Sequence, residues 1–125
     1  MSQDIVADAL NQIMNIKKAK KEELTVKKHS KFLLSVLAIA KLKRYVKDYK
    51  VLSSNELKIT IGNLNNCRAI KPRFVVKTSE IEKYVKRYLP AKNIGLIIVS
   101  TSKGLMTHQT AFDKNLGGSL IAYMY

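Results

Sequence analysis

The sequence is poor in the residues and segments that mark secreted and membrane proteins. Its single cysteine, Cys67, excludes a disulfide within the chain, so nothing points to an oxidising compartment. No apolar run approaches the ~18 residues that a membrane-spanning helix needs. Residues 1–4 include an acidic residue and no basic segment, which argues against a secretory signal. We therefore expect a soluble cytoplasmic protein.

Acidic residues are also scarce, with 9 Asp and Glu against 23 Lys and Arg, for a formal net charge of +14. The residues up to Asn65 carry 13 basic and 6 acidic side chains, and the later residues carry 10 and 3, so each half has a net charge of +7. Charge spread in this way suits a protein that lies against a large polyanion, and nucleic acid is the commonest one. Because 46% of the 125 residues are apolar, the chain can still bury a core.

The chain lacks a recognisable catalytic or metal-binding constellation. Its two histidines, His29 and His108, have no metal-ligand spacing with Cys67 or with a pair of carboxylates. His108 is predicted to be a polar residue in the first turn of a helix. Cys67 is predicted to be a small hydrophobic residue, although the neighbouring Arg68 could lower its pKa. We expect no catalytic residues, no metal and no cofactor; a small enzyme that uses Cys67 or His108 is kept as an alternative.

Hydrophobic periodicity predicts an α+β fold of two small subdomains, residues 1–64 and 65–125, divided at the turn residues 62–66. The first is expected to be an α-β-α-β-β unit in which Ser30 caps the second helix and residues 53–55 join the last two strands. Its expected helices cover residues 4–16 and 31–44, and its expected strands cover residues 24–26, 45–52 and 56–61.

The second subdomain is predicted to be mostly β, with short helices. A strand-like run covers residues 69–77, and Ser79 and Glu82 have the spacing of a capping box for a helix that ends near residue 90. A buried strand follows over residues 94–99. Thr107 is predicted to cap a short helix through residue 114, closed by Asn115 or Gly117 in a left-handed conformation. The last strand is expected over residues 119–125.

The most distinctive polar stretch follows the buried strand and comprises Ser100, Thr101, Ser102, Lys103 and Gly104. Hydroxyl groups donate and accept hydrogen bonds, a lysine supplies a point charge suited to phosphate, and a glycine allows a partner to come close. The alternative interpretation is a polar turn that only ends a strand. A second basic feature is the cluster formed by Lys17, Lys18, Lys20 and Lys21, which is either a solvated loop or a phosphate contact.

The sequence Ser-Thr-Ser-Lys-Gly-Leu-Met-Thr-His of residues 100–108, followed by Ala111 and by Leu116-Gly117-Gly118, resembles the small-subunit ribosomal protein eight family. The opening residues 5–11 also resemble the first helix of that family. Residues 70–74 and 87–91 resemble its archaeal and eukaryotic branch. The resemblance therefore extends over essentially the whole chain.

This resemblance implies a primary binder of ribosomal RNA in the central domain of the small subunit, which docks on a helix with an irregular internal loop and supports platform assembly beside neighbouring ribosomal proteins. By matching position, the hydroxyl-rich stretch would contact unpaired bases in the minor groove, and Gly117 and Gly118 would shape the surface beside it. Basic residues would hold phosphates without reading sequence. The complete set of expected RNA-binding residues is Ser100, Thr101, Ser102, Lys103, Gly104, Thr107, Gly117, Gly118, Lys17, Lys18, Lys20, Lys21, Lys31, Lys71 and Arg73.

The chain departs from the family pattern at two places. Phe112 and Asp113 stand where the family often has a basic residue after Ala111, so a phosphate contact there is in doubt. Asn115 stands where a glycine is common, and asparagine tolerates the left-handed conformation. The main alternative function is a basic nucleic-acid-binding protein held by charge alone; adsorption to acidic membranes is a weaker one, because no helix pairs a wide apolar face with a lysine-rich face.

Overall fold

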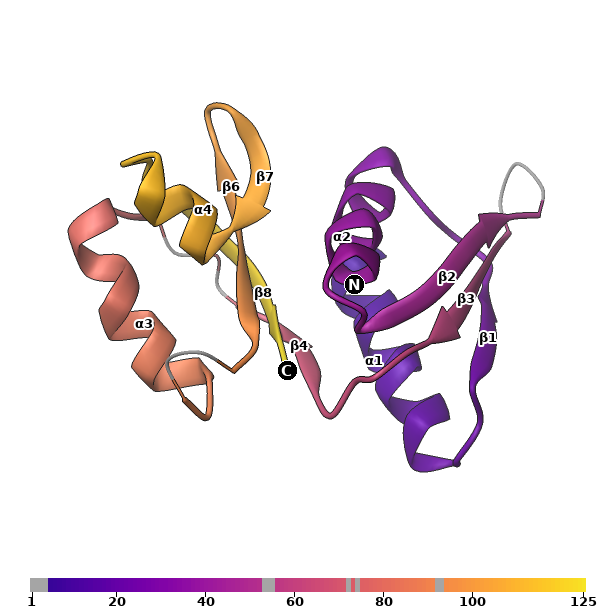
Figure 1. Ribbon diagram of the computed structural model, residues 1–125. Coiled ribbons are helices and arrows are strands. Elements are labelled where there is room, and N and C mark those ends of the chain that lie inside the picture. The colour runs from indigo at the N-terminus through magenta and orange to yellow at the C-terminus, as the bar shows by residue number, and fades with distance from the viewer. Residues whose placement is uncertain (1–4, 53–55, 72, 74, 92–93) are drawn as a thin grey trace. The chain divides into compact units, whose positions relative to one another are not determined.

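The computed structural model describes residues 5–52, 56–71, 73, 75–91 and 94–125. The chain divides into two compact units, Met1–Cys67 and Arg68–Tyr125, where the sequence predicted a boundary between residues 64 and 65. Helices and antiparallel sheets in both units confirm the expected α+β class (Figure 1).

The first unit is a three-stranded antiparallel sheet with two helices packed against it. The helices contact the sheet through its edge strands, α1 against β1 and α2 against β2. In the middle strand, Leu57 and Ile59 are fully buried and pair with Val26 and Leu24 of its neighbour, so the strand alternates as predicted. The strand order is β1-β3-β2, from the elements α1 (Ile5–Lys18), β1 (Glu23–Val26), α2 (Lys31–Leu42), β2 (Val46–Val51) and β3 (Leu57–Ile61).

The two helices of this unit begin and end for identifiable reasons. The N–H of Leu33 donates to Ser30 Oγ at 3.2 Å, which confirms the predicted cap of α2. That helix is two residues shorter than predicted, because Arg44 takes a left-handed conformation with φ of +68°. In contrast, α1 extends two residues further than predicted. Lys17 and Lys18 complete its last turn, where positive charge is favourable to the helix dipole. The predicted connection over residues 53–55 lies outside the described residues.

The second unit is a five-stranded sheet with its helices on one side. Its strands are β4 (Cys67–Ala69), β5 (Val75–Val76), β6 (Leu96–Thr101), β7 (Gly104–Thr107) and β8 (Gly118–Met124). The sheet order is β4-β8-β6-β7, and β5 also pairs with β8. The helical elements are the 3₁₀ turn η1 (Thr78–Glu80), α3 (Ile81–Tyr88) and α4 (His108–Asp113).

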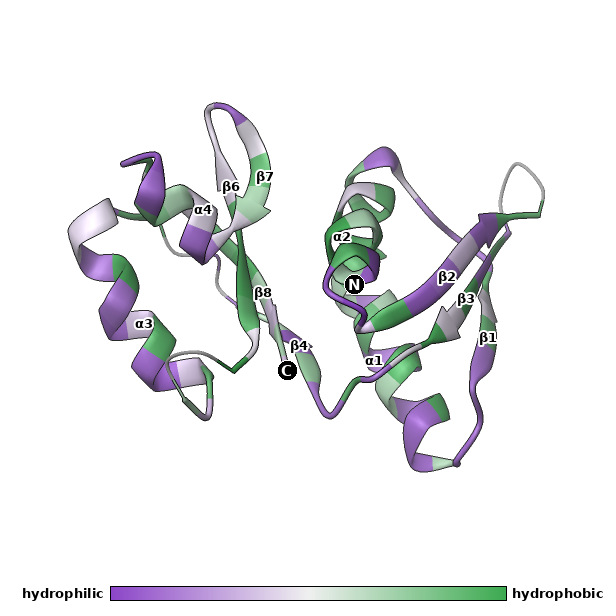
Figure 2. Ribbon diagram, viewed as in Figure 1, coloured by the Kyte–Doolittle hydropathy of each residue, from purple (hydrophilic) through white to green (hydrophobic). Residues whose placement is uncertain are grey.

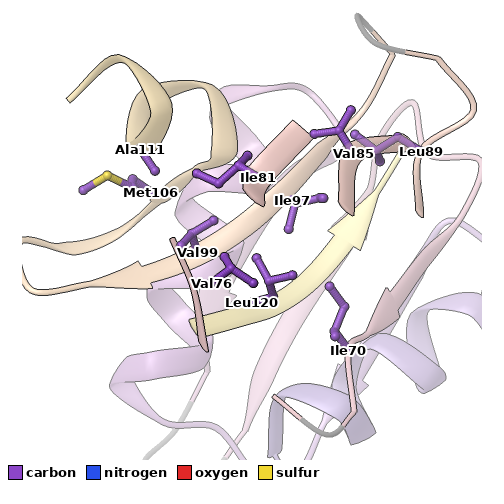
Figure 3. Packing of buried hydrophobic residues seen from close by; sticks show 10 residues of the cluster. All are labelled: Ile70, Val76, Ile81, Val85, Leu89, Ile97, Val99, Met106, Ala111 and Leu120. Carbon is purple, nitrogen blue, oxygen red and sulfur yellow. The ribbon is translucent and has the colours of Figure 1, made fainter. Parts of the chain in front are cut away.

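The core of the second unit lies between this sheet and the two α-helices. Figure 2 shows hydrophobic residues along β6 and β8 and a mixture of hydrophobic and hydrophilic residues along α3. Residues from all these elements meet in one cluster, and beside it Tyr88 stacks on Tyr123 with ring centroids 5.1 Å apart. Figure 3 shows the cluster: Ile70, Val76, Ile81, Val85, Leu89, Ile97, Val99, Met106, Ala111 and Leu120.

The predicted single strand over residues 69–77 is wrong. The chain forms two short strands, β4 and β5, and between them the N–H of Ile70 still donates to the carbonyl of Ile121 at 2.9 Å. Proline has no backbone N–H to donate to a strand ladder, so the proline at position 72 explains why one continuous strand is not formed. Residue 72 lies outside the described residues.

Strand β7 is absent from the sequence prediction, which assigned no strand to residues 104–107. Those residues pair with β6 from Thr101↔Gly104 to Ile98↔Thr107. The glycine that begins this stretch and the hydroxyl-rich residues before it are typical of loops, and pairing with a buried strand makes the stretch extended. Tertiary context therefore outweighs local propensity here.

The start of α3 also differs from the prediction. A 3₁₀ turn precedes the helix, and the N–H of Lys77 donates to Glu80 Oε1 at 2.9 Å. Glu80, instead of the predicted Glu82, thus reaches back to the start of the helical segment. The pattern of residue types was right for a capping box, but its register was shifted by two residues.

His108 is the first residue of α4, as the sequence predicted, but only 4% of its surface is exposed. Its Nδ1 accepts a hydrogen bond from the N–H of Ile97 at 3.1 Å. Pairing between β6 and β7 stops at Ile98↔Thr107, so the imidazole satisfies the next backbone donor beyond the ladder. His108 is therefore part of the packing of α4 on the sheet.

Cys67 is buried, with 3% of its surface exposed, and its thiol donates to the carbonyl of Leu10 with the sulfur 3.7 Å from the oxygen. Burial raises the pKa of Cys67 to about 12, so the neighbouring Arg68 does not make the thiol reactive. This agrees with the prediction of a small hydrophobic residue.

In the described part of the chain, no helix has the length and apolar character to cross a membrane.

We predict that iodoacetamide alkylates Cys67 far more slowly in the native protein than in protein unfolded by urea, as measured by mass spectrometry at fixed pH. The raised pKa has a second consequence. Above pH 9 the unfolded thiol loses its proton while the folded thiol keeps it, so this group makes the free energy of unfolding fall as the pH rises toward 12. Equal alkylation rates in the two states would contradict the burial of the thiol.

Candidate nucleic-acid interface

The hydroxyl-rich stretch forms the tight end of the β6–β7 hairpin. Thr101 and Gly104 pair with each other, and Ser102 and Lys103 make the exposed two-residue turn between them. Gly104 has a φ of +108°, while neither turn residue has a positive φ. A turn of this kind followed by a left-handed glycine is a common hairpin connection. We call residues 100–104 the hairpin tip.

Gly104 is required here for its backbone conformation and not for space. A Cβ placed on this residue would meet no atom within 4 Å, whereas its φ is one that side chains with a Cβ rarely adopt. The open surroundings also mean that a partner can approach the backbone at this point.

The side chain of Thr101 holds the hairpin tip closed. Its hydroxyl donates to the carbonyl of Gly104 at 2.9 Å and accepts from the N–H of Lys103 at 3.1 Å. The same oxygen lies 4.0 Å from the sulfur of Met106, which belongs to the buried cluster. The turn is thus ordered before any partner binds, and Thr101 has an internal role.

Gly118, the first residue of β8, brings that strand against the hairpin tip, and the preceding Gly117 lies against Val76 and Lys77. A Cβ on Gly118 would collide with the carbonyl oxygen of Ser100 and lie 3.2 Å from the Cα of Thr101. A Cβ on Gly117 would lie 2.5 Å from the carbonyl oxygen of Val76. Backbone therefore packs directly on backbone at this end of the sheet, and the structure brings the hairpin tip and the glycine pair together.

Two residues that sequence reasoning missed also belong to this end of the sheet. Ser119 pairs with Ser100 across β8 and β6, and Lys77 lies beside Gly117, with its Cα 3.2 Å from the position of an added Cβ. Directly paired side chains in an antiparallel sheet lie on the same face. The position of Ser119 directly after the glycine pair could have indicated that it lies near the hairpin tip. Nothing in the sequence indicates that Lys77 lies at this end of the sheet.

The hydroxyls at this end of the sheet divide into two groups. Thr101 is engaged within the turn, as described above. Ser100, Ser102 and Ser119 make no side-chain hydrogen bond to any residue that the structure describes. Ser102 is exposed and the other two are half-buried. These three hydroxyls are therefore available as donors and acceptors for a partner.

Thr107, in contrast, lies at the far end of β7 and is 7% exposed. The hydroxyl oxygen of Thr107 accepts a hydrogen bond from the N–H of Thr110 at 3.3 Å. It also lies 3.1 Å from the hydroxyl oxygen of Thr110. Thr107 is therefore the N-cap of α4, as the sequence predicted, and it lies apart from the hairpin tip.

The other expected basic residues do not gather at the hairpin tip. Lys71 and Arg73 are exposed on the connection from β4 to β5 in the second unit. The remaining five belong to the first unit: Lys17, which is half-buried, and the exposed Lys18, Lys20, Lys21 and Lys31.

Two of the lysines that the structure describes form ion pairs within the chain. The ion pairs found among the described residues are Lys41–Asp48 and Lys58–Glu23, each at 3.2 Å and both exposed. Hydrogen bonds from Lys41 and from the N–H of Tyr49 hold the pKa of Asp48 below its usual value. The described residues contain no group of His, Cys, Asp and Glu that could hold a metal ion.

Lys20 occupies a backbone position that favours glycine. The φ of Lys20 is +61°. The N–H of Lys20 donates to the carbonyl of Lys17 at 2.9 Å, and the N–H of Lys21 donates to the carbonyl of Ile16 at 3.1 Å. This is the Schellman arrangement at the end of α1, in which a residue with a Cβ costs roughly 1 kcal/mol more than glycine. Arg44, at the end of α2, is also left-handed.

These features define a basic protein of two α+β units that presents an ordered polar turn. The family model described as "Ribosomal protein S8" matches residues 4–125. The chain is also 43% identical over 129 residues to the "Small ribosomal subunit protein uS8" of Nanoarchaeum equitans (strain Kin4-M), with all of both chains covered. The chain belongs to the ribosomal protein S8 family.

Family membership confirms several expectations from the sequence. The protein is a component of the small ribosomal subunit, located on the cytoplasmic ribosome, and it is not an enzyme. Similarity to an archaeal protein also fits the archaeal branch that residues 70–74 and 87–91 indicated. The alternative of a small enzyme is thereby removed.

We predict that Thr101→Val lowers the free energy of unfolding by about 1 kcal/mol, because the variant loses both hydrogen bonds that close the hairpin tip. Thr101→Ser is the matched control, since it keeps the hydroxyl, and it should unfold at nearly the wild-type urea concentration. If Thr101→Val unfolds like the wild type, the hydroxyl does not hold the turn.

Proposed function

We propose that this chain binds the central domain of small-subunit ribosomal RNA, at a helix with an irregular internal loop, and supports assembly of the platform. Residues 65–125 form the RNA-binding subdomain in this proposal. The observation that carries it is the ordered hairpin tip, whose exposed Ser102 and half-buried Ser100 have hydroxyls without a partner among the described residues.

The chemistry of the hairpin tip favours RNA that departs from regular pairing. A regular A-form helix shows a shallow minor groove of 2′-hydroxyls, and sequence is read mostly where bases are unpaired. Small hydroxyl side chains can donate to and accept from base edges and 2′-hydroxyls at short range. In the proposal, Ser100, Ser102 and the backbone at Gly104 make these contacts, and Lys103 adds charge.

The neighbouring residues have supporting roles in this proposal. Thr101 keeps the turn ordered, and Gly117 and Gly118 let β8 lie close enough to present Ser119 beside Ser100. Thr107 acts indirectly, by capping α4. An interface ordered before binding loses less conformational entropy when the RNA arrives.

Basic residues outside the hairpin tip would contact phosphates and set the register of the protein on the RNA. We assign this role to Lys71 and Arg73 in the second unit and to Lys17, Lys18, Lys20, Lys21 and Lys31 in the first. Phosphate contacts contribute affinity that is independent of sequence and that falls with salt. The two kinds of contact therefore respond differently to mutation.

The alternative is binding by charge alone, without recognition of a particular RNA shape. The even spread of basic residues over both halves of the chain supports it. Binding by charge alone does not explain why the hydroxyl of Thr101 is used within the turn to order Ser100 and Ser102 beside it. We therefore favour recognition of the irregular loop; neighbouring small-subunit proteins are the other expected partners.

We predict that Ser102→Ala weakens binding to a ribosomal RNA fragment carrying the irregular internal loop by on the order of 1–3 kcal/mol, as loss of a specific contact does. Binding to the same fragment with the loop replaced by paired bases should not change. Equilibrium binding at two salt concentrations measures both, and the preference for the intact loop should persist at the higher salt.

Ser35→Ala is the matched control for this experiment. Ser35 is an exposed serine on α2 whose hydroxyl donates to the carbonyl of Lys31 at 3.0 Å, outside the hairpin tip. This variant should bind both RNAs like the wild type. Equal affinity of the wild type for both RNAs, lost in parallel as salt rises, would instead support binding by charge alone.

We predict that Lys20→Gly makes the protein more stable but a weaker RNA binder. Glycine relieves the left-handed strain, so the free energy of unfolding should rise by about 1 kcal/mol. Loss of one phosphate contact should lower affinity for all RNAs and reduce the salt slope by about 1. Lys20→Gln removes the charge but keeps an ordinary side chain in the left-handed conformation, so it should lose RNA affinity without the gain in stability, and it separates the two effects. An unchanged salt slope in both variants would exclude a phosphate contact at Lys20.

A further inference from the structure

A groove with a volume of about 370 Å³ opens between α3 and α4 of the second unit. Both helices pack on the same face of the sheet through Ile81 and Val85 of α3 and Ala111 of α4, three residues of the buried cluster (Figure 3). The groove is lined by residues of these two helices only. It is therefore a feature of one unit, separate in sequence from the hairpin tip.

The groove has an apolar part, formed by side chains of both helices, within a lining that also contains polar residues. Ile81 and Val85 are 2% and 6% exposed and form part of its wall, together with the buried His108. Phe112 also lines it, yet 54% of the surface of Phe112 is exposed. A large aromatic side chain left half in water beside an apolar wall is the pattern of a contact surface that a partner completes.

The groove is also lined by two carboxylates, Glu82 and Asp113. Residues 68–125 contain three acidic residues, and the third, Glu80, is engaged with the N–H of Lys77. Glu82 and Asp113 are exposed and form no ion pair with any residue that the structure describes. In a chain of net charge +14, both remaining acids of this unit thus line one apolar groove.

Helix stability accounts for one of these acids but not for the other. Glu82 lies in the first turn of α3, where negative charge is favourable to the helix dipole. Asp113 is the last residue of α4, where negative charge is unfavourable. Its position is therefore better explained by a partner than by the helix on which it lies.

We propose that this groove binds a short basic segment of a neighbouring protein, which inserts one or two large apolar side chains beside Phe112 and places Lys or Arg against Glu82 and Asp113. The charge of the groove selects this occupant, because opposite charges meet across an interface and like charges are excluded. RNA is the wrong partner here, since two carboxylates would face its phosphates.

The inference concerns a second surface and goes beyond the RNA contact proposed above. A groove between two helices that takes apolar anchors, with charges at its rim, is a recurring way to recognise a peptide. The hairpin tip and the basic residues would then bind RNA, while the groove binds protein through apolar contact and carboxylates.

The test uses the full chain, isotopically labelled for amide NMR, and a fluorescent peptide of about 12 residues with leucine and phenylalanine at its centre and arginines on both sides. Two control peptides have glutamates in place of the arginines or serines in place of the apolar residues. The arginine-flanked peptide should bind and shift the amide signals of residues 81–86 and 108–113, and neither control should bind. No binding, equal binding of the glutamate-flanked peptide, or shifts confined to other residues would each overturn the proposal.

A double variant, Glu82→Gln with Asp113→Asn, should weaken binding of the arginine-flanked peptide by about tenfold, because two exposed charge contacts are lost. Glu22→Gln, at an exposed glutamate of the first unit, is the matched control and should bind like the wild type. Unchanged binding in the double variant would overturn the role of the carboxylates.

RNA binding by the double variant separates this inference from the RNA proposal. At the higher salt concentration, the double variant should bind the ribosomal RNA fragment as well as the wild type does. A changed affinity for the RNA would mean that the groove belongs to the RNA surface, and the proposal would fail. Failure of the RNA to prefer its irregular loop would count against the RNA proposal alone.

Discussion

The contact on which the site depends is the approach of one backbone to another at Gly118 and Ser100. No Cβ fits between them, so any other residue at position 118 would push β8 away from β6. The same pair of strands continues into the buried cluster through Val99 and Leu120, which pair next to it. Packing energy in the core and the shape of the exposed hairpin tip are therefore coupled through one short stretch of sheet.

The hairpin tip shows how similar side chains take different roles within a few residues. Thr101 points its hydroxyl into the turn, whereas Ser100 and Ser102 have no partner within the described chain. A β-branched residue is stiff about χ1, so threonine suits the internal position, and a serine loses less when it is held ready for a partner. Order at the tip is thus supplied by the protein and not by what it binds.

The sequence predicted the elements best where periodicity decides them. The helices, the alternating strand β3 and the caps at Ser30 and Thr107 follow from local patterns and agree with the structure. Three features that the sequence did not predict depend on how strands pair: β7, the burial of His108 and the place of Ser119 opposite Ser100. Periodicity within one segment carries no information on which residues of another segment will lie opposite it.

Charge in this protein is arranged at two scales. The excess of basic residues is spread over both units and gives long-range attraction to a polyanion, which salt screens. Against that background, local exceptions are informative: Lys20 stays basic at a position where glycine would be more stable, and Asp113 stays acidic where the helix disfavours it. Each of these two residues lowers the stability of the folded protein, and no contact within the described chain compensates for the loss. Both costs are offset if the complete subunit supplies a phosphate to the first and a basic segment to the second, so the stability of the isolated protein and its fitness for assembly are different quantities.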